Sequence, residues 1–227
     1  MSDPVFLDLS TAPPQGVAPA FHPPTPHPTI TFGGASSYPP DVATRLSDEA
    51  STIIARYPQP RSALLPLLHL TQSEDGYITR AGVEFCAAQL ELTAAEVAAV
   101  ATFYSMFRRT ETGEYLVGVC TNTLCAVLGG DEILRALADH LGIVPGDTTG
   151  DGRITLEHIE CNAACDFAPV VMVNWEFFDN QTPQRTIELV EDLRAGVPTT
   201  PARGTGSVCS FRTTARLMAG LPEDGPR

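Results

Sequence analysis

Two pairs of closely spaced cysteines constrain the fold of this 227-residue chain more than any other feature. Cys120 and Cys125 lie five positions apart in VCTNTLCAV, and Cys161 and Cys165 lie four positions apart in IECNAACDF. Each pair follows a segment of strand-like sequence. Close thiol pairs are typical of disulfides, of a zinc site or of an iron–sulfur cluster. If two of the strands are neighbours in one sheet, their ends can bring all four sulfurs together.

Whether the thiols can form disulfides depends on the cellular compartment of the protein. The start, MSDPVFLDLS, has no basic region and carries two aspartates, so it does not read as a secretory signal. We therefore expect a cytosolic protein, in which thiols stay reduced and disulfides are disfavoured. Spacing alone leaves zinc and an iron–sulfur cluster equally open. The small residues between the cysteines suit a cluster, because backbone amides can then approach the sulfurs.

Net charge and the absence of common catalytic motifs exclude several classes of function. The net charge is −13 and the chain contains no lysine, so nucleic acid and anionic lipid are unfavourable partners and other proteins are favoured. No apolar run approaches the length of a membrane span, and we expect no direct membrane insertion. There is no P-loop, no Gly-x-Ser-x-Gly and no Cys-x-x-Cys motif. We expect a chain without catalytic residues or a substrate site of its own.

Composition and periodicity divide the chain into four parts. Residues 1–40 contain ten prolines and are predicted to form an extended arm. Residues 41–110 show helical periodicity and predict a small helical bundle. Residues 111–198 alternate between strand and helix patterns, in a thioredoxin-like order. Residues 199–227 are rich in Pro, Gly, Ser and Thr and are predicted to form a flexible tail.

Caps and turn residues place the individual elements. Four helices are predicted: one from Asp41, one over 62–72, one after Thr79, and one opened by the capping box of Thr93 and Glu96. The second half is predicted to contain strands at 115–120, 153–161, 169–174 and 176–178, and helices at 131–141 and from Pro183 to Gly196. Together these elements predict a fold of the α+β or α/β class.

At this point the sequence resembles a known family. CTNTLC and CNAAC, together with the upstream EVAAVATFYSMF, resemble the thioredoxin-like [2Fe-2S] subunits of respiratory complex I, the family of the E subunit of NADH-quinone oxidoreductase and the mitochondrial 24 kDa subunit. The resemblance covers about residues 45–198. It implies a helical bundle followed by a thioredoxin-like [2Fe-2S] ferredoxin domain, and the extended N- and C-terminal arms predicted from composition lie outside it. It also implies that Cys120, Cys125, Cys161 and Cys165 ligate one [2Fe-2S] cluster.

The resemblance implies a function and its partners. The chain would exchange single electrons with the FMN of a flavin- and NADH-binding subunit, so FMN and NADH would be bound by that partner. Further subunits of the peripheral arm would surround it, at the cytoplasmic face of the inner membrane. The same motif occurs in subunits of NAD-linked hydrogenases and formate dehydrogenases, which stay an alternative. A zinc-stabilised adaptor without redox activity is a more distant one.

The family pattern gives two expectations for the segment around Cys161 and Cys165, residues 161–168, which we call the second cysteine loop. The family usually has a triplet such as Leu-Gly-Ala where this chain has Asn162-Ala163-Ala164. Because Ala163 replaces a glycine, we expect it to have a negative φ, and we expect Asn162 to add a hydrogen bond near sulfur. The family fold also predicts a cis bond between Ala168 and Pro169.

The remaining cysteines and the ends of the chain give further expectations. Cys86 is predicted to be a buried small residue in a helix, and Cys209 a free, exposed thiol. We expect both ends to be fastened to partner subunits through apolar and basic residues: Phe21, Ile30, Phe32 and Tyr38 in the arm, and Arg203, Phe211, Arg212, Arg216, Leu217 and Met218 in the tail.

Overall fold

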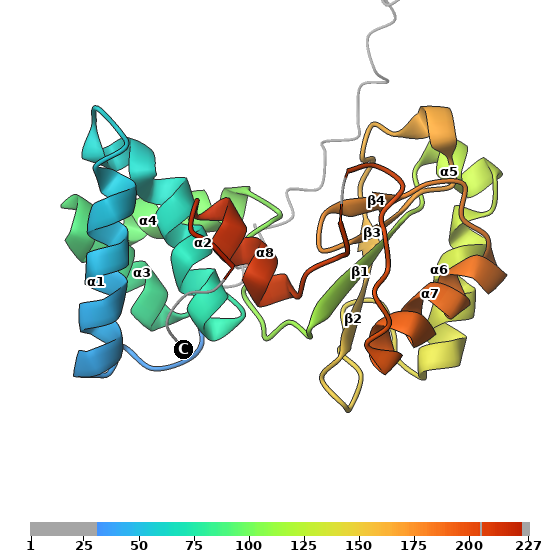
Figure 1. Ribbon diagram of the computed structural model, residues 1–227, viewed down its shortest axis with the longest axis horizontal. Coiled ribbons are helices and arrows are strands. Elements are labelled where there is room, and N and C mark those ends of the chain that lie inside the picture. The colour runs from blue at the N-terminus through green and yellow to red at the C-terminus, as the bar shows by residue number, and fades with distance from the viewer. Residues whose placement is uncertain (1–30, 205, 224–227) are drawn as a thin grey trace, which may run out of the picture. The chain divides into compact units, whose positions relative to one another are not determined.

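The computed structural model describes residues 31–204 and 206–223 (Figure 1). All the helices and strands of the described residues lie in the compact unit that begins at Phe32. Two residues predicted to anchor the arm, Phe21 and Ile30, lie outside the described residues. The fourfold division predicted from composition, with boundaries at 40, 110 and 198, stays a prediction.

The helical part contains the four predicted helices. Its elements are α1 (Pro40–Ile54), the short 3-10 helix η1 (Pro60–Ala63), α2 (Leu64–Asp75), α3 (Arg80–Leu90) and α4 (Ala94–Phe103). The predicted capping box is present: the Glu96 amide donates to the Thr93 hydroxyl, and the Thr93 amide donates to the Glu96 carboxylate. The apolar faces of these helices meet in one core that includes Leu46, Leu67 and Val97.

Among the described residues, the sheet part contains four strands, three α-helices and one 3-10 helix. Its elements are β1 (Tyr115–Cys120), α5 (Thr123–Val127), α6 (Gly130–Leu141), β2 (Ile154–Ile159), the 3-10 helix η2 (Cys165–Phe167), β3 (Val171–Val173), β4 (Glu176–Phe178) and α7 (Pro183–Ala195). The strand order is β2-β1-β3-β4, with β1 and β2 parallel and the other pairs antiparallel. Cys120 pairs with Ile159, so β1 and β2 end at the same edge of the sheet. This mixed sheet confirms the predicted thioredoxin-like α/β layer.

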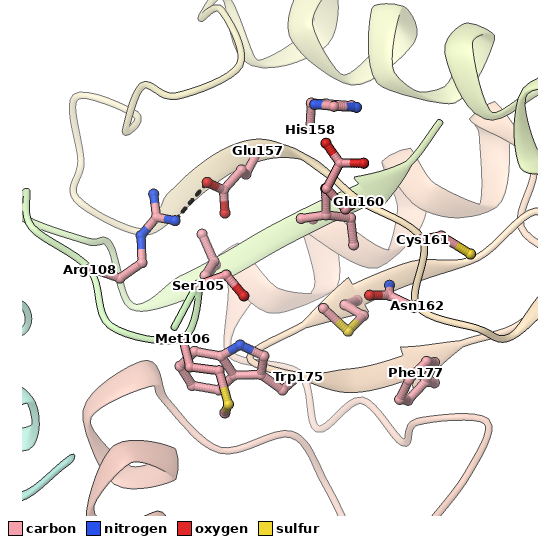
Figure 2. Close-up of a pocket in the computed structure, with 14 residues that line it drawn as sticks. Ser105, Met106, Arg108, Glu157, His158, Glu160, Cys161, Asn162, Trp175 and Phe177 are labelled. Carbon is pink, nitrogen blue, oxygen red and sulfur yellow. Dashed lines mark hydrogen bonds and ion pairs between the residues drawn. The ribbon is translucent and has the colours of Figure 1, made fainter. Parts of the chain in front are cut away.

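The two faces of the sheet differ. Helices α6 and α7 cover one face, where Val117 and Leu156 pack with Ile133 and Val190 in a second core. On the other face, alternate strand residues line an open cavity of about 520 Å³ that reaches the second cysteine loop, and its lining includes Leu116, Gly118, Met172, Phe177 and Asn162 (Figure 2). Arg108 and Glu157 form an ion pair of 2.6 Å at its rim.

The prediction of a flexible tail is wrong for residues 211–218. Residues 211–218 form helix α8 (Phe211–Met218), which packs against α2, and Phe211 is only 1% exposed. The Arg212 guanidinium donates to the carbonyl oxygens of Glu74 and Asp75, and Arg216 pairs with Glu49 at 2.7 Å. Composition failed here because the partners of these side chains lie far away in the sequence, in α1 and α2.

The residues at the start of the unit also contact their own chain. Phe32 and Tyr38 pack against the core of the helical part, and the Tyr38 hydroxyl donates to the Asp75 carboxylate at 2.6 Å. Phe211 is buried in the same chain, whereas Leu217 and Met218 are 43% and 44% exposed. The expectation that all these side chains are held by partner subunits is therefore wrong for Phe32, Tyr38 and Phe211.

Among the described residues, no single helix has the length and apolar character needed to cross a membrane. Helices α3 and α4 meet that test only as a pair, and they are bent by 118° relative to each other.

Candidate [2Fe-2S] site

The four predicted site residues come together at the carboxyl ends of β1 and β2. Cys120 is the last residue of β1, and Cys165 is the first residue of η2. Cys125 lies in the short helix α5, where we predicted a loop, and Cys161 follows the end of β2 by two residues, where we predicted strand. All four side chains line one cavity of about 240 Å³. The prediction that strand ends gather the four thiols is confirmed.

The four sulfurs are arranged as two pairs that differ in exposure. Cys120 and Cys125 are 2% and 3% exposed, whereas Cys161 and Cys165 are exposed, with their sulfurs 4.0 Å apart. Among the described residues, no three His, Cys, Asp or Glu side chains converge as a single metal ion requires. A binuclear cluster takes two protein ligands on each iron, so four thiols arranged as two pairs can hold it.

The protonation of the thiols is coupled to what they bind. Burial raises the pKa of Cys125 to about 11, and the hydrogen bond with Cys161 raises the pKa of Cys165. The metal-free thiols of Cys125 and Cys165 are therefore protonated near neutral pH. Because thiolate is the form that ligates, loading the site must release protons.

The first cysteine loop is fixed by close packing against the start of α6. A Cβ atom on Gly130 would lie 2.5 Å from the Cys120 carbonyl oxygen and 2.9 Å from that of Cys125, so only glycine fits. The Cys120 amide donates to the Val170 carbonyl at 3.2 Å, which ties the loop to the segment before β3. Both cysteines are thus held by backbone contacts with little free space.

The second cysteine loop differs from two of its predictions. Ala163 has φ +54°, not a negative value, because the chain must turn within three residues to bring Cys165 back beside Cys161. The hydrogen bond near sulfur comes from the backbone: the Ala163 amide donates to Cys161 Sγ at 3.4 Å, while the buried Asn162 Nδ2 has no partner among the described residues. The Ala168–Pro169 bond is cis, as predicted.

The other two cysteines do not line this cavity. Cys86 is fully buried in α3, as predicted, and burial raises its pKa to about 12. Cys209 is only partly exposed, and its sulfur lies 3.6 Å from the Glu223 carboxylate, so the prediction of an exposed thiol is wrong.

Sequence reasoning missed the apolar rim of the site and one charged residue beside it. Leu124, Val127 and Phe167, at 41%, 77% and 45% exposed, lie next to the cysteines in α5 and η2. Arg203 contacts the second cysteine loop from a segment predicted to be a flexible tail. The rim could have been found from the apolar residues next to each cysteine, but nothing in the sequence near Arg203 indicates its partners.

Comparison with known proteins agrees with this geometry. The family model of the thioredoxin-like [2Fe-2S] ferredoxins matches residues 50–194. The E subunit of NADH-quinone oxidoreductase from Mycobacterium tuberculosis is 59% identical over 223 residues, which cover 98% of this chain and 84% of that protein. The mitochondrial NADH dehydrogenase [ubiquinone] flavoprotein 2 of Dictyostelium discoideum is 39% identical over 150 residues, 65% of this chain and 61% of its own length.

Among solved structures, a NAD⁺-reducing [NiFe]-hydrogenase in the air-oxidized state superposes with a TM-score of 0.53 at 24% identity, over 60% of this chain and 23% of that one. This likeness shows the fold alone. The family match and the relatives that cover most of the chain show more: this chain belongs to the thioredoxin-like [2Fe-2S] ferredoxin family, among the relatives of the E subunit of NADH-quinone oxidoreductase.

Proposed function

We propose that Cys120, Cys125, Cys161 and Cys165 ligate one [2Fe-2S] cluster, and that the chain is the electron-transfer subunit of the NADH dehydrogenase module of respiratory complex I. One observation carries the ligand assignment: the four thiols reach one cavity from the ends of two neighbouring parallel strands. The similarity to the E subunits of NADH-quinone oxidoreductases supports the wider function.

When bound, the cluster supplies one-electron redox chemistry, whereas hydride transfer to a flavin moves electrons in pairs. The chain's own residues provide the surroundings. Buried Cys120 and Cys125 form an apolar floor together with Ala164 and Val170, and the Ala163 amide donates to the Cys161 sulfur. A low dielectric and hydrogen bonds to sulfur are the means by which a protein tunes the potential of such a site.

The rim of the cavity supports a docking site for a flavin- and NADH-binding partner subunit, which would carry FMN and NADH. Leu124, Val127 and Phe167 expose apolar surface directly beside the cysteines. A partner that covers this rim would exclude water from the site and place its flavin near the cysteines. Other subunits of the peripheral arm, at the cytoplasmic face of the membrane, would contact the remaining surface.

The alternatives are less well supported. A hydrogenase-type or formate dehydrogenase-type complex has in its favour a structural likeness at 24% identity, whereas the relatives from NADH-quinone oxidoreductases are 59% identical over almost the whole chain. A zinc adaptor has the cysteine spacings in its favour, whereas the family match is to [2Fe-2S] ferredoxins and the relatives are oxidoreductase subunits.

Metal analysis of purified full-length chain tests the ligand assignment. We expect about two irons and two acid-labile sulfides per chain, as the cluster formula requires, and an electron paramagnetic resonance (EPR) signal on reduction. Replacing Cys120, Cys125, Cys161 or Cys165 with Ser should abolish that signal. C86S and C209S are the matched controls and should keep it. Zinc without sulfide, or cluster loss in either control, would contradict the assignment.

Copurification tests the partner. A tagged chain expressed in its own cells should bring down a flavoprotein that oxidises NADH. Recovery of a nickel–iron hydrogenase or a formate dehydrogenase instead would replace complex I with one of the alternatives.

A further inference from the structure

Arg203 lies between two aromatic rings beside the second cysteine loop. Its guanidinium carbon is 5.2 Å from the centre of the Phe167 ring and 5.1 Å from that of Phe177. Both distances are within the range of cation–π contact. Phe167 belongs to η2, which begins with Cys165, whereas Phe177 belongs to β4. The guanidinium therefore joins the cysteine loop to the edge strand of the sheet.

Carboxylates fix the same guanidinium. Nε and Nη2 of Arg203 donate to the two oxygens of Asp179 at 3.0 and 3.1 Å, and Asp179 is only 11% exposed. A second carboxylate, that of Asp166, lies 3.6 Å from Nη2. Asp166 directly follows Cys165, so the arginine also offsets the negative charge nearest to this cysteine.

Backbone hydrogen bonds bring the three segments into register. The Ala202 amide donates to the Phe177 carbonyl at 2.7 Å, and the Asn180 amide donates to the Phe167 carbonyl at 2.8 Å. The first bond sets the position of the segment that carries Arg203, and the second ties the end of η2 to the turn after β4. These bonds and the Arg203 contacts tie η2, which begins with Cys165, to β4 and to the segment that carries Arg203.

We propose that Arg203 is a positioning residue for the [2Fe-2S] site: it holds η2 so that Cys165 keeps its place beside Cys161, and its charge raises the reduction potential of the site. The inference rests on the proposed ligand set. The two roles use different properties of the side chain. Holding η2 needs the planar guanidinium, which can stack and bind a carboxylate through two hydrogen bonds, whereas the effect on potential needs only a positive charge.

Three variants and a control separate these roles in the full-length, cluster-loaded chain. R203Q removes charge and stacking, R203K keeps the charge but loses the planar group, and F167L removes one ring and keeps the charge. R194Q is the matched control. Arg194 is 37% exposed against 39% for Arg203, and it contacts Asp151 at 2.9 Å and Glu191 at 3.2 Å. Asp151 precedes β2, so this cluster lies at the opposite ends of the strands from the cysteines.

The first measurement is the rate at which a chelator removes iron. We expect R203Q and R203K to lose iron roughly tenfold faster than the unmodified chain, because supporting contacts around metal ligands change affinity by about ten- to a hundredfold. F167L should lose iron at a rate between that of the unmodified chain and that of the two Arg203 variants. The second is the midpoint potential, followed by EPR. It should fall in R203Q and stay near its original value in R203K, F167L and R194Q, because only R203Q removes a positive charge beside the site.

The third measurement needs no cluster. In the metal-free chain, amides of residues 161–168 should exchange hydrogen faster in R203Q and R203K than in R194Q, while exchange in α6 stays unchanged. Circular dichroism spectra that match the unmodified chain exclude general unfolding.

The outcomes are distinguishable from those of the ligand test. The positioning role would be overturned if R203Q released iron as slowly as the unmodified chain, or if R203K did so. An unchanged potential in R203Q would overturn the electrostatic role. If replacing the four cysteines fails to abolish the cluster, the proposed ligand set itself is wrong, whatever Arg203 does.

Discussion

The helical part and the cysteine end of the sheet differ in how they are stabilised. In the helical part, the buried Gln72 side chain has partners within the chain: it donates to the Met106 carbonyl and accepts from the Arg108 amide. At the cysteine end, Cys161 and Cys165 stay exposed and apolar side chains surround the cavity. The first region is stabilised by its own contacts, whereas we expect the second to gain much of its stability from the cluster that it is proposed to bind.

Removing the metal gives the largest expected contrast between the two regions. After chelation, amides of residues 121–129 and 160–168 should exchange hydrogen roughly tenfold faster or more, because binding energy at a metal site is also local folding energy. Amides of α2 and α3 should be unaffected. Hydrogen exchange read by mass spectrometry measures both in one sample, and equal changes in both regions would remove the distinction.

The helical part contains a buried histidine, His69, whose titration affects its stability. His69 is 7% exposed, its Nδ1 has no partner among the described residues, and its ring centre lies 4.8 Å from that of Phe107. Burial lowers its pKa from 6.5 to about 4. Since the folded pKa lies below the unfolded one, the unfolded state binds the proton more readily. The stability from this group is present above pH 6.5 and is lost as the pH falls toward 4.

Replacing His69 with Leu should remove that loss, which reaches about 3 kcal/mol across the window. Urea unfolding at pH 7 and pH 4.5 gives the change in unfolding free energy with pH for each protein. The difference between the two changes reports His69 alone, because the carboxylates that both proteins share titrate in the same way. H158Q, at an exposed histidine of β2, is the control for loss of a surface imidazole. Parallel pH dependence of H69L and the unmodified chain would contradict the assignment.

Adding one methyl group tests the close packing of the first cysteine loop. G130A should lower the free energy of unfolding by about 1–3 kcal/mol and weaken cluster retention, because the new Cβ would collide with the carbonyls of Cys120 and Cys125. G150A is the matched control, since a Cβ there meets open space. Thermal unfolding and iron content measure the two effects, and equal stability of the two variants would refute the packing argument.

The smallest effect is expected in the second loop. Ala163 at φ +54° is strained by about 1 kcal/mol, which A163G would relieve, but glycine also makes the unfolded chain more flexible by up to about 1 kcal/mol. We therefore expect A163G to change the free energy of unfolding by less than about 1 kcal/mol. Chemical denaturation measures it, with A164G, at a buried position of negative φ in the same loop, expected to be clearly destabilising.

Local signals in the sequence were enough to predict most of the fold. The capping box at Thr93, the proline after Thr182, and glycines 142 and 196 each act within one turn of the helix they begin or end, so a short window contains the whole signal. The cysteine site was predictable for a related reason. Two thiol pairs that each follow a strand come together if the two strands are parallel neighbours in the sheet. β1 and β2 are such neighbours.

The features that were missed depend on distant partners. Helix α8 is short and carries two arginines and two threonines, and only contact with α2 gives its apolar face a core to join. The positive φ of Ala163 is required by the position of Cys165, not by the preference of alanine. Arg203 acquires its role from Asp166 and Asp179, which no local pattern connects with it.

Helix α8 also sets the order in which the chain can complete its structure during synthesis. The helical part is translated first, yet its core includes Ala219 and Leu221, and Arg216 pairs with Glu49 across 167 positions of sequence. A nascent chain that ends before α8 therefore still exposes the surface of α2 that α8 will cover. Loop closure over such a separation is slow compared with helix formation. The cell thus has an interval in which chaperones can bind that surface, and a prematurely terminated chain would keep it open to proteases.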